Sequence, residues 1–176
     1  LKNYDYSQAG YYFVTICVHK GQCLLVETAV QEMIQLWWEK LPEKFTAVVL
    51  DAFVIMPNHI HFIIVIAHDD GTHPQEVGAH PRVRLEAGQT RGSAPTLGTI
   101  VQWFKTMTTN AYIHGVKEQD WQPFPGKLWQ RNYYEQIIRD ERHLTAVREY
   151  IHNNPANWDA DKLHPKAPPN SFNVTW

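Results

Sequence analysis

The sequence predicts that residues 1–176 form one α+β domain, a ferredoxin-like split βαβ unit with a central antiparallel sheet, helices packed on it and an extra C-terminal helix. Three observations lead to this fold class. A chain of 176 residues, 44% of them hydrophobic, is long enough for a single domain with its own core. Strand-like and helical patterns follow one another in the order β-α-β-β-α-β-α. Pro57-Asn58 separates two strand-like runs, which is typical of an antiparallel hairpin.

The first part of the chain supplies three strands and one helix. Residues 11–18 are rich in β-branched and aromatic side chains and predict a strand. In residues 28–41 the apolar side chains recur every three or four positions, which predicts an amphipathic helix that ends before Pro42. Residues 47–56 and 60–66 predict two further strands. Because residues 60–66 are apolar on both faces, we expect them in the middle of the sheet.

A long polar segment then precedes the second helix. Residues 67–96 contain mostly Gly, Pro, His, Asp, Thr and Arg without periodicity, and they predict a flexible loop. Helical spacing returns in residues 97–113, with Thr96 or Thr99 as the capping residue.

The last strand and helix complete the sheet. Residues 133–138 predict a fourth strand, and residues 140–154 predict a helix that Asp140 caps and Pro155 ends. Residues 159–176 are expected to be a C-terminal tail.

Composition excludes several classes of protein. Sixteen Lys and Arg against eighteen Asp and Glu give a net charge of −2, which excludes a wholly basic, histone-like binder. No run approaches the roughly 18 apolar residues of a membrane span, and the N-terminus lacks an apolar signal-peptide core, so we expect a cytoplasmic protein without membrane contact. Because the chain starts at Leu1, we expect that a natural N-terminal segment precedes it. Two cysteines, Cys17 and Cys23, argue against a disulfide framework or a structural zinc site.

The motif that carries most chemical information is Met56-Pro57-Asn58-His59-Ile60-His61-Phe62. Residues two apart in a strand point to the same face, so His59 and His61 can hold one divalent ion through their imidazoles. Two hydrogen-bonded histidines at the end of a sheet are the simpler interpretation of this pattern alone.

A second motif lies near the end of the last predicted helix. Tyr150 and Asn154 are four residues apart, so a phenol and an amide oxygen share one helix face. Taken alone, a core tyrosine and a helix stop explain this segment equally well. Asn154 also precedes a proline, which disfavours the helical conformation and can turn its side chain away.

Taken together, the two motifs form a coherent site. Two imidazoles and an amide oxygen suit Mg²⁺ or Mn²⁺ with positions left open for substrate oxygens, and the chain has no His-Glu-x-x-His helix of a zinc peptidase. A divalent ion would act as a Lewis acid on a phosphate, and a neighbouring tyrosine could attack the phosphorus and form a phosphotyrosine.

The chain resembles the REP-associated tyrosine transposases, members of the HUH superfamily of single-strand DNA transposases. The resemblance runs from about residue 11 to residue 158. It depends on three segments in the same order: the Met-Pro-Asn-His-Ile-His strand, Leu128-Trp129-Gln130 leading into Tyr133 to Glu141, and Tyr150 to Pro155.

The resemblance implies a role for each motif residue. It implies that His59 and His61 hold the catalytic ion, that Tyr150 on the C-terminal helix is the nucleophile, and that Asn154 completes the metal site. Tyr133 and Tyr134 are rival nucleophiles by residue type, but a strand places them on opposite faces and neither has an Asn one turn later.

The resemblance also implies a DNA partner, because relatives cleave and rejoin single-stranded DNA beside hairpins. Between residues 80 and 117 five basic residues face one acidic residue, so a local basic track is compatible with the acidic total. The candidate DNA-binding residues are Arg82, Arg84, Arg91, Lys105, Trp129 and Arg131. We favour a monomer over a homodimer.

Three functions remain open on the sequence alone. The first is a metal-dependent transposase that forms a 5′-phosphotyrosine and releases a 3′-hydroxyl. The second is a non-catalytic protein that binds hairpin DNA or RNA and retains the fold. The third is a metal-dependent phosphodiesterase that uses activated water. Only the first forms a covalent protein–DNA adduct.

Overall fold

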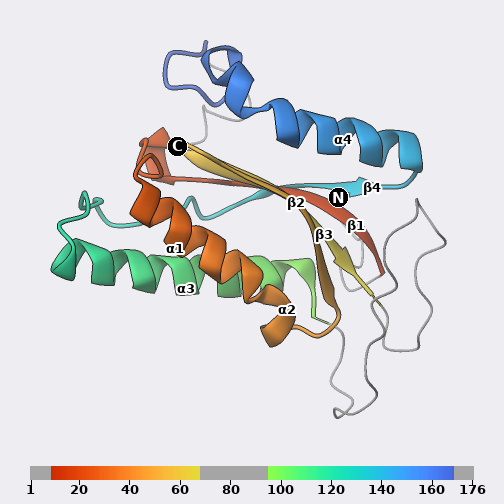
Figure 1. Cartoon of the computed structure of the whole chain (residues 1–176), viewed down its shortest axis with the longest axis horizontal. Helices are drawn as coiled ribbons and strands as arrows, with labels where there is room; N and C mark the ends of the chain where they lie inside the picture. Colours follow the sequence, from red (N-terminus) through yellow and green to blue (C-terminus); the bar gives the residue numbers. More distant parts are fainter. Residues whose placement is uncertain (1–8, 68–94, 169–176) are drawn as a thin grey trace.

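The computed structural model describes residues 9–67 and 95–168, and it has the predicted α+β architecture (Figure 1). Four strands form one sheet in the order β2-β3-β1-β4, and every pair of neighbours is antiparallel. The strands are β1 (Gly10–Cys17), β2 (Val48–Met56), β3 (His59–Ile66) and β4 (Tyr134–Ile138). Because β3 lies between β1 and β2, and β1 lies between β3 and β4, both halves of the fold are split βαβ units.

The helices cover both faces of this sheet (Figure 1). The α-helices are α1 (Thr28–Glu39), α2 (Leu41–Lys44), α3 (Leu97–Glu118) and α4 (Glu141–Asn153), and two short 3₁₀ helices are η1 (His19–Gly21) and η2 (Pro155–Ala160). Helices α1 and α3 lie on one face, while α4 and the short η2 that follows it lie on the opposite face. No helix within residues 9–67 and 95–168 is long and apolar enough to cross a membrane.

Strand alternation divides the hydrophobic residues between two cores. On β1, Tyr12, Val14 and Ile16 belong to the larger core, which includes buried residues of α1 and α3. On β3, Ile63 belongs instead to a smaller core with Leu144 and other residues of α4. The odd-numbered residues of β1 and β3 therefore face α4.

The central position of β3 is confirmed. Every residue of β3 is buried, and its two neighbours are β1 and β2. The Pro57-Asn58 turn joins β2 and β3 as predicted, with Met56 paired to His59 across the hairpin. The chain therefore brings the histidine motif to the protected centre of the sheet.

Both predicted helix caps are confirmed. The Thr96 hydroxyl accepts a hydrogen bond from the backbone N–H of Thr99, and the Asp140 carboxylate accepts one from the backbone N–H of His143. Each bond satisfies an N–H group that has no partner inside the helix.

The predicted helix ends needed correction in two places. The helix expected over residues 28–41 ends at Glu39, and Leu41 begins the separate helix α2, where Pro42 fits the first turn. The helix expected over residues 97–113 continues to Glu118. Its extension contains Gly115, whose missing side chain leaves room for the Trp121 ring.

The structure describes only the edges of the predicted loop and part of the predicted tail. Residues 68–94, which make up most of the loop expected over 67–96, lie outside the described part of the chain. Residues 159–168 of the expected tail are described, and Leu163 among them is buried. This segment packs close to the histidine motif.

Candidate active site

Two histidines at the start of β3 meet on the sheet face that α4 covers. His59 and His61 are buried, and their Nε2 atoms lie 3.0 Å apart. Two ligands on neighbouring corners of an octahedral ion, each about 2.1 Å from its centre, lie about 3 Å from one another. The spacing of the two nitrogens therefore suits a shared divalent cation.

The second nitrogen of each imidazole has its own partner. His59 Nδ1 lies 2.7 Å from Asn58 Oδ1, and His61 Nδ1 lies 2.8 Å from the Thr15 hydroxyl. Asn58 comes from the β2–β3 turn, and Thr15 pairs with His61 across β1 and β3. Metal-binding histidines commonly have such a partner, which orients the ring.

Burial keeps both imidazoles neutral. It lowers the pKa of His61 to about 3. It also lowers the pKa of His59 well below the usual value, and the neighbouring His61 lowers it further. Neutral imidazole is the form that binds a metal ion, so the environment favours the ligand form.

A carboxylate completes a cluster of three donor groups. Asp161 follows η2, and single ligand atoms of His59, His61 and Asp161 all lie within 4.8 Å of one another. Its Oδ1 accepts a hydrogen bond from the backbone N–H of Leu163 at 2.6 Å. Two imidazoles and a carboxylate could hold a metal ion.

Sequence reasoning did not find Asp161. The residue lies in the stretch assigned to the C-terminal tail, and no spacing relates it to the histidines in the chain. Only the return of the chain after η2 brings it to the start of β3. Nothing local distinguishes it from the nearby exposed Asp159.

Tyr150 brings a phenol to the same histidine pair. Its hydroxyl lies 3.2 Å from His61 Nε2, and the Phe13 ring contacts both side chains. The residue is 47% exposed, so solvent has access to it. Burial of its inner part raises the pKa of Tyr150 and the Asp161 carboxylate raises it further, while the Asn154 side chain acts in the opposite direction. The phenol is therefore protonated at neutral pH.

Asn154, which caps the C-terminal end of α4, keeps a helical backbone conformation despite the proline that follows it. It has helical backbone angles of φ −58° and ψ −44°, so the conformational shift expected before a proline does not occur. Its side chain is 3% exposed, and its Oδ1 has no hydrogen-bond partner among the residues that the structure describes. A buried oxygen without a partner is costly unless an ion or a water satisfies it. This oxygen therefore fits the predicted role of a metal ligand.

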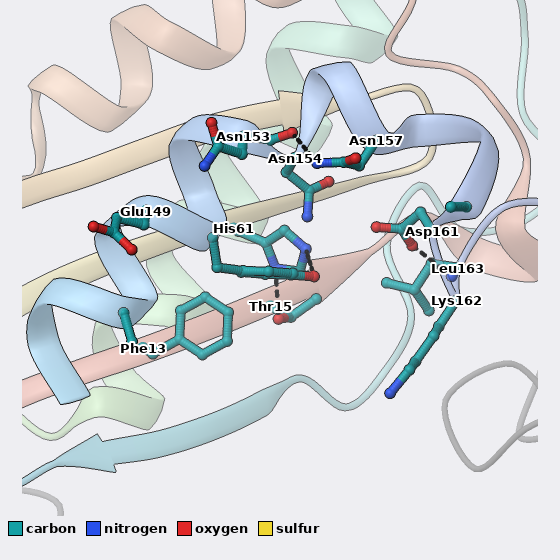
Figure 2. Close-up of a pocket in the computed structure, with 13 residues that line it drawn as sticks. Phe13, Thr15, His61, Glu149, Asn153, Asn154, Asn157, Asp161, Lys162 and Leu163 are labelled. Carbon is teal, nitrogen blue, oxygen red and sulfur yellow. Dashed lines mark hydrogen bonds between the residues drawn. The ribbon is translucent and has the colours of Figure 1, made fainter. Parts of the chain in front are cut away.

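A cavity of about 620 Å³ gives access to these groups (Figure 2). It lies where α4 and η2 meet the sheet, and its walls include His61, Tyr150, Asn154, Asp161 and Lys162. Of these, His61 and Asp161 belong to the donor cluster, Tyr150 supplies the phenol, and Asn154 supplies the buried amide oxygen. The space can therefore admit a substrate to the phenol and the metal-binding donors together.

An ion pair fixes α4 above the sheet. The Arg148 guanidinium donates two hydrogen bonds to the Asp51 carboxylate, at 3.0 Å from Nε and 2.6 Å from the terminal nitrogen. Asp51 lies where β2 shifts its register against β3. Because Arg148 is two residues before Tyr150, this contact restrains the part of the helix that carries the phenol.

The predicted DNA-binding residues are not brought to this cavity as a group. Arg82, Arg84 and Arg91 lie outside the described residues. Arg131 is exposed.

Two other members of that set, Lys105 and Trp129, have structural contacts instead. Lys105 is 8% exposed, and its ammonium group donates hydrogen bonds to the carbonyls of Gln130, Arg131 and Asn132. Trp129 is 4% exposed, and its indole N–H donates to the Thr108 hydroxyl. A contact of either side chain with a base or a phosphate would require it to leave these partners, so the expectation that both contact DNA stays a prediction.

The rival tyrosines lie elsewhere. Neither Tyr133 nor Tyr134 lines the cavity. The Tyr133 ring instead lies near the Lys105 ammonium group, 5.6 Å from its nitrogen.

No protein-family model matches the chain. A protein of Haemophilus influenzae whose function is uncharacterised is 36% identical, and the match covers 93% of this chain and 90% of that protein.

Two solved structures are similar to this fold. The structure of a REP-associated tyrosine transposase bound to a REP hairpin matches with a TM-score of 0.58 and 18% identity, over 89% of this chain and 72% of that chain. A Deinococcus radiodurans R1 protein provisionally assigned as a transposase matches with a TM-score of 0.48 and 16% identity, over 87% of this chain and 96% of that chain.

The identity to the Haemophilus influenzae protein extends over nearly the whole of both chains, and the fold is shared with the hairpin-bound transposase. The chain therefore belongs to the same family as the Haemophilus influenzae protein, and it has the fold of the REP-associated tyrosine transposases.

Proposed function

We propose that this protein is a metal-dependent transposase that cleaves and rejoins single-stranded DNA beside hairpins. In this proposal Tyr150 is the nucleophile, and His59, His61 and Asn154 hold Mg²⁺ or Mn²⁺, with the Asp161 carboxylate close enough to take part. The shared fold supports the class of protein, and the geometry of the site supports the chemistry.

One observation carries the proposal more than any other. The Tyr150 hydroxyl lies 3.2 Å from the Nε2 atom of His61, the same atom that lies 3.0 Å from His59 Nε2. A tyrosine with only a packing role has no reason to direct its hydroxyl to the Nε2 atom through which a buried histidine faces a second histidine. A nucleophile that attacks a phosphate held by the ion must lie at this position.

In the proposed cleavage reaction, the metal ligands and Tyr150 have different roles. A bound divalent ion would polarise the scissile phosphate and ease deprotonation of a nearby phenol. Tyr150 then attacks the phosphorus as its phenolic proton leaves, the Tyr150 oxygen–phosphorus bond forms, and the bond from phosphorus to the 3′-oxygen breaks. The departing 3′-oxygen takes up a proton. The 5′-phosphotyrosine conserves the bond, so a 3′-hydroxyl can reverse the step and rejoin DNA without a nucleotide cofactor.

The DNA partner and the oligomeric state form part of the same proposal. The hairpin bound to the transposase of the same fold supports a hairpin-bearing single strand as substrate. Tyr150 and the histidine pair come from one chain, so a single copy carries both the phenol and its candidate metal ligands. This arrangement supports a monomer that acts on its own.

The test is formation of a covalent adduct with DNA. Wild-type protein is incubated with end-labelled hairpin-bearing single strands and Mn²⁺ or Mg²⁺, and the products are separated by denaturing electrophoresis. We expect a labelled protein band, which Tyr150→Phe abolishes because it removes the attacking oxygen while preserving the ring. Tyr133→Phe and Tyr134→Phe are matched controls that should retain the band.

Each other outcome has a definite meaning. An adduct in Tyr150→Phe would refute the assignment of the nucleophile, and peptide mapping would then locate the true tyrosine. Metal-dependent cleavage without any adduct would favour a phosphodiesterase that activates water. Binding of the strand without cleavage would favour a protein that retains the fold but not the reaction.

A further inference from the structure

The orientation of the Asn58 side chain is determined by contacts away from the histidines. Its Nδ2 donates hydrogen bonds to the carbonyl of Leu163 at 2.7 Å and to the carbonyl of Gly21 at 3.2 Å. Rotating the amide by half a turn would place its oxygen against these two carbonyl oxygens. Oδ1 therefore points to His59, whose Nδ1 lies 2.7 Å away.

This orientation determines which nitrogen of His59 carries the proton. An amide oxygen can only accept a hydrogen bond, so the proton must lie on Nδ1. A neutral imidazole has one proton, which leaves Nε2 with a free lone pair facing His61. Nothing in this contact depends on whether an ion is present.

His61 is held in a different way. Its Nδ1 faces the Thr15 hydroxyl at 2.8 Å, and a hydroxyl can either donate or accept. Its Nε2 lies 3.0 Å from His59 Nε2, and two bare nitrogens would repel each other at that distance. Because His59 offers a lone pair, the proton between them must belong to His61 Nε2. The Tyr150 oxygen, 3.2 Å from the same atom, can then only accept from this N–H as a second partner. Thr15 then donates to the bare Nδ1 of His61.

Metal binding requires the opposite tautomer of His61. To coordinate through Nε2, His61 must lose that proton and carry one on Nδ1, where Thr15 becomes the acceptor. One proton leaves and one is taken up, so the imidazole stays neutral and the exchange with solvent is balanced.

We propose that Asn58 and Thr15 are positioning residues with distinct roles at the metal site: Asn58 holds His59 permanently as the Nδ1–H tautomer, and Thr15 allows His61 to change tautomer when the ion binds. This inference rests on the proposed metal site. The same amide of Asn58 also holds the Leu163 carbonyl, so it links the histidine pair to the segment that carries Asp161.

Nitrogen NMR of the imidazole rings tests the proposal directly on the wild-type chain. The protein is labelled with ¹⁵N-histidine at pH 7.5, and spectra are recorded without metal and with saturating Mg²⁺, which is diamagnetic. Without metal we expect Nδ1–H for His59 and Nε2–H for His61. With Mg²⁺, His59 should be unchanged and His61 should shift to Nδ1–H.

The spectra distinguish a failure of the roles proposed for Asn58 and Thr15 from a failure of the proposed function. An Nε2–H tautomer of His59 without metal would overturn the role of Asn58, whatever the protein does to DNA. Bound Mg²⁺ without a change at His61 would overturn the role of Thr15. No uptake of Mg²⁺ by a protein with the expected metal-free tautomers would overturn the proposed metal site and the switch together.

Variants provide a second readout. Thr15→Val keeps the shape of the side chain but removes the hydroxyl, and we expect Mn²⁺ affinity by calorimetry to fall about 10- to 100-fold, the usual effect of losing such a partner. Thr15→Ser restores a hydroxyl and should recover affinity to within about threefold of wild type. Equal affinities for Thr15→Val and Thr15→Ser would contradict the proposal.

Asn58→Ala tests the second residue, with Asn110→Ala on the exposed side of α3 as the matched control. Loss of the fixed acceptor should leave His59 as a mixture of both tautomers, while Asn110→Ala leaves it as Nδ1–H. A pure Nδ1–H tautomer in a folded Asn58→Ala protein would contradict the role of Asn58. If this variant does not fold, the wild-type spectra and the Thr15 pair still decide the question.

Discussion

At the scale of single residues, the site depends on polar atoms that the fold buries in a defined orientation. His59 and His61 each use one nitrogen for a protein partner and direct the other toward the shared centre. The buried oxygen of Asn154 has no partner in the described part of the chain, although an unsatisfied buried oxygen costs about 1–3 kcal/mol. Stability alone would not select this arrangement. A bound cation would satisfy all three groups.

Loss of the imidazoles should therefore remove the ion without unfolding the protein. Replacing both His59 and His61 with Ala leaves too few protein ligands to localise a divalent cation. We expect calorimetric titration to show no Mn²⁺ binding, while circular dichroism stays close to that of the wild type. An unchanged affinity for Mn²⁺ would rule out this metal site.

Calorimetric titration with Mn²⁺ can also test whether the Asp161 carboxylate is a metal ligand. Asp161→Asn keeps the size of the side chain and an oxygen that still accepts from Leu163, but it removes the charge. If Asp161 contributes to the site, Mn²⁺ affinity should fall about tenfold or more, because a charged ligand attracts a divalent ion more strongly than an amide. Affinity equal to the wild type would place Asp161 outside the ligand set.

At the scale of elements, two features bring the phenol and the metal ligands together. Residues four apart share a helix face, so Tyr150 and the residue after α4, Asn154, point to one place. Residues two apart share a strand face, so both histidines point to α4. The Arg148–Asp51 ion pair then holds the helix over the sheet.

The close packing of Gly115 in α3 against the Trp121 ring should make substitution of this glycine destabilising. A Cβ atom there would lie 2.3 Å from the Trp121 ring, which is far inside van der Waals contact. Overpacking costs about 1–3 kcal/mol, whereas alanine gains only about 1 kcal/mol of helix propensity. We therefore expect Gly115→Ala to lower the free energy of unfolding measured in urea.

Gly98→Ala is the control on the same helix. The nearest atoms to its added Cβ lie 3.7 and 3.8 Å away, which is ordinary contact. We expect this variant to be unchanged or more stable by up to about 1 kcal/mol. A Gly115→Ala protein as stable as Gly98→Ala would show that the Trp121 ring moves aside at little cost.

At the scale of the whole molecule, Lys105 joins the large core to the connection that leads into β4. Its ammonium group meets three successive backbone carbonyls from a nearly buried position on α3. Burial lowers the pKa of Lys105 to about 8, and the nearby Cys17 opposes the shift. The folded protein therefore releases this proton at a lower pH than the unfolded chain, whose lysine pKa is 10.5.

This difference predicts how stability depends on pH. Between about pH 8 and pH 10.5 the unfolded state binds more protons at this position, so the contribution of Lys105 to stability becomes more favourable as pH rises. We expect the wild type to gain stability relative to Lys105→Met over this range, by on the order of 3 kcal/mol in total. Urea unfolding of both proteins at several pH values measures the gain, and a constant difference between them would contradict it.

Much of the fold could be predicted from local patterns. Strand and helix periods, the Pro57-Asn58 turn and the caps at Thr96 and Asp140 depend on neighbours in the chain, so the sequence alone indicates them. The apolar character of both faces of residues 60–66 was enough to predict a central strand. The end of α3 was missed because the helical pattern was followed only to Ile113; Gly115, a poor helix former, lies in the extension, where its lack of a side chain leaves room for the Trp121 ring.

By itself, the sequence determined the α+β fold class and the pairing of residues that share a strand or helix face, because backbone geometry relates neighbours two or four positions apart. Tertiary structure alone decided which of these faces meet. It brought Asp161 to the histidines, placed the Tyr150 hydroxyl beside His61, and buried Lys105 and Trp129 in hydrogen bonds within the protein. Such contacts join residues far apart in the chain, and they form only when burial of the two hydrophobic cores brings the elements together.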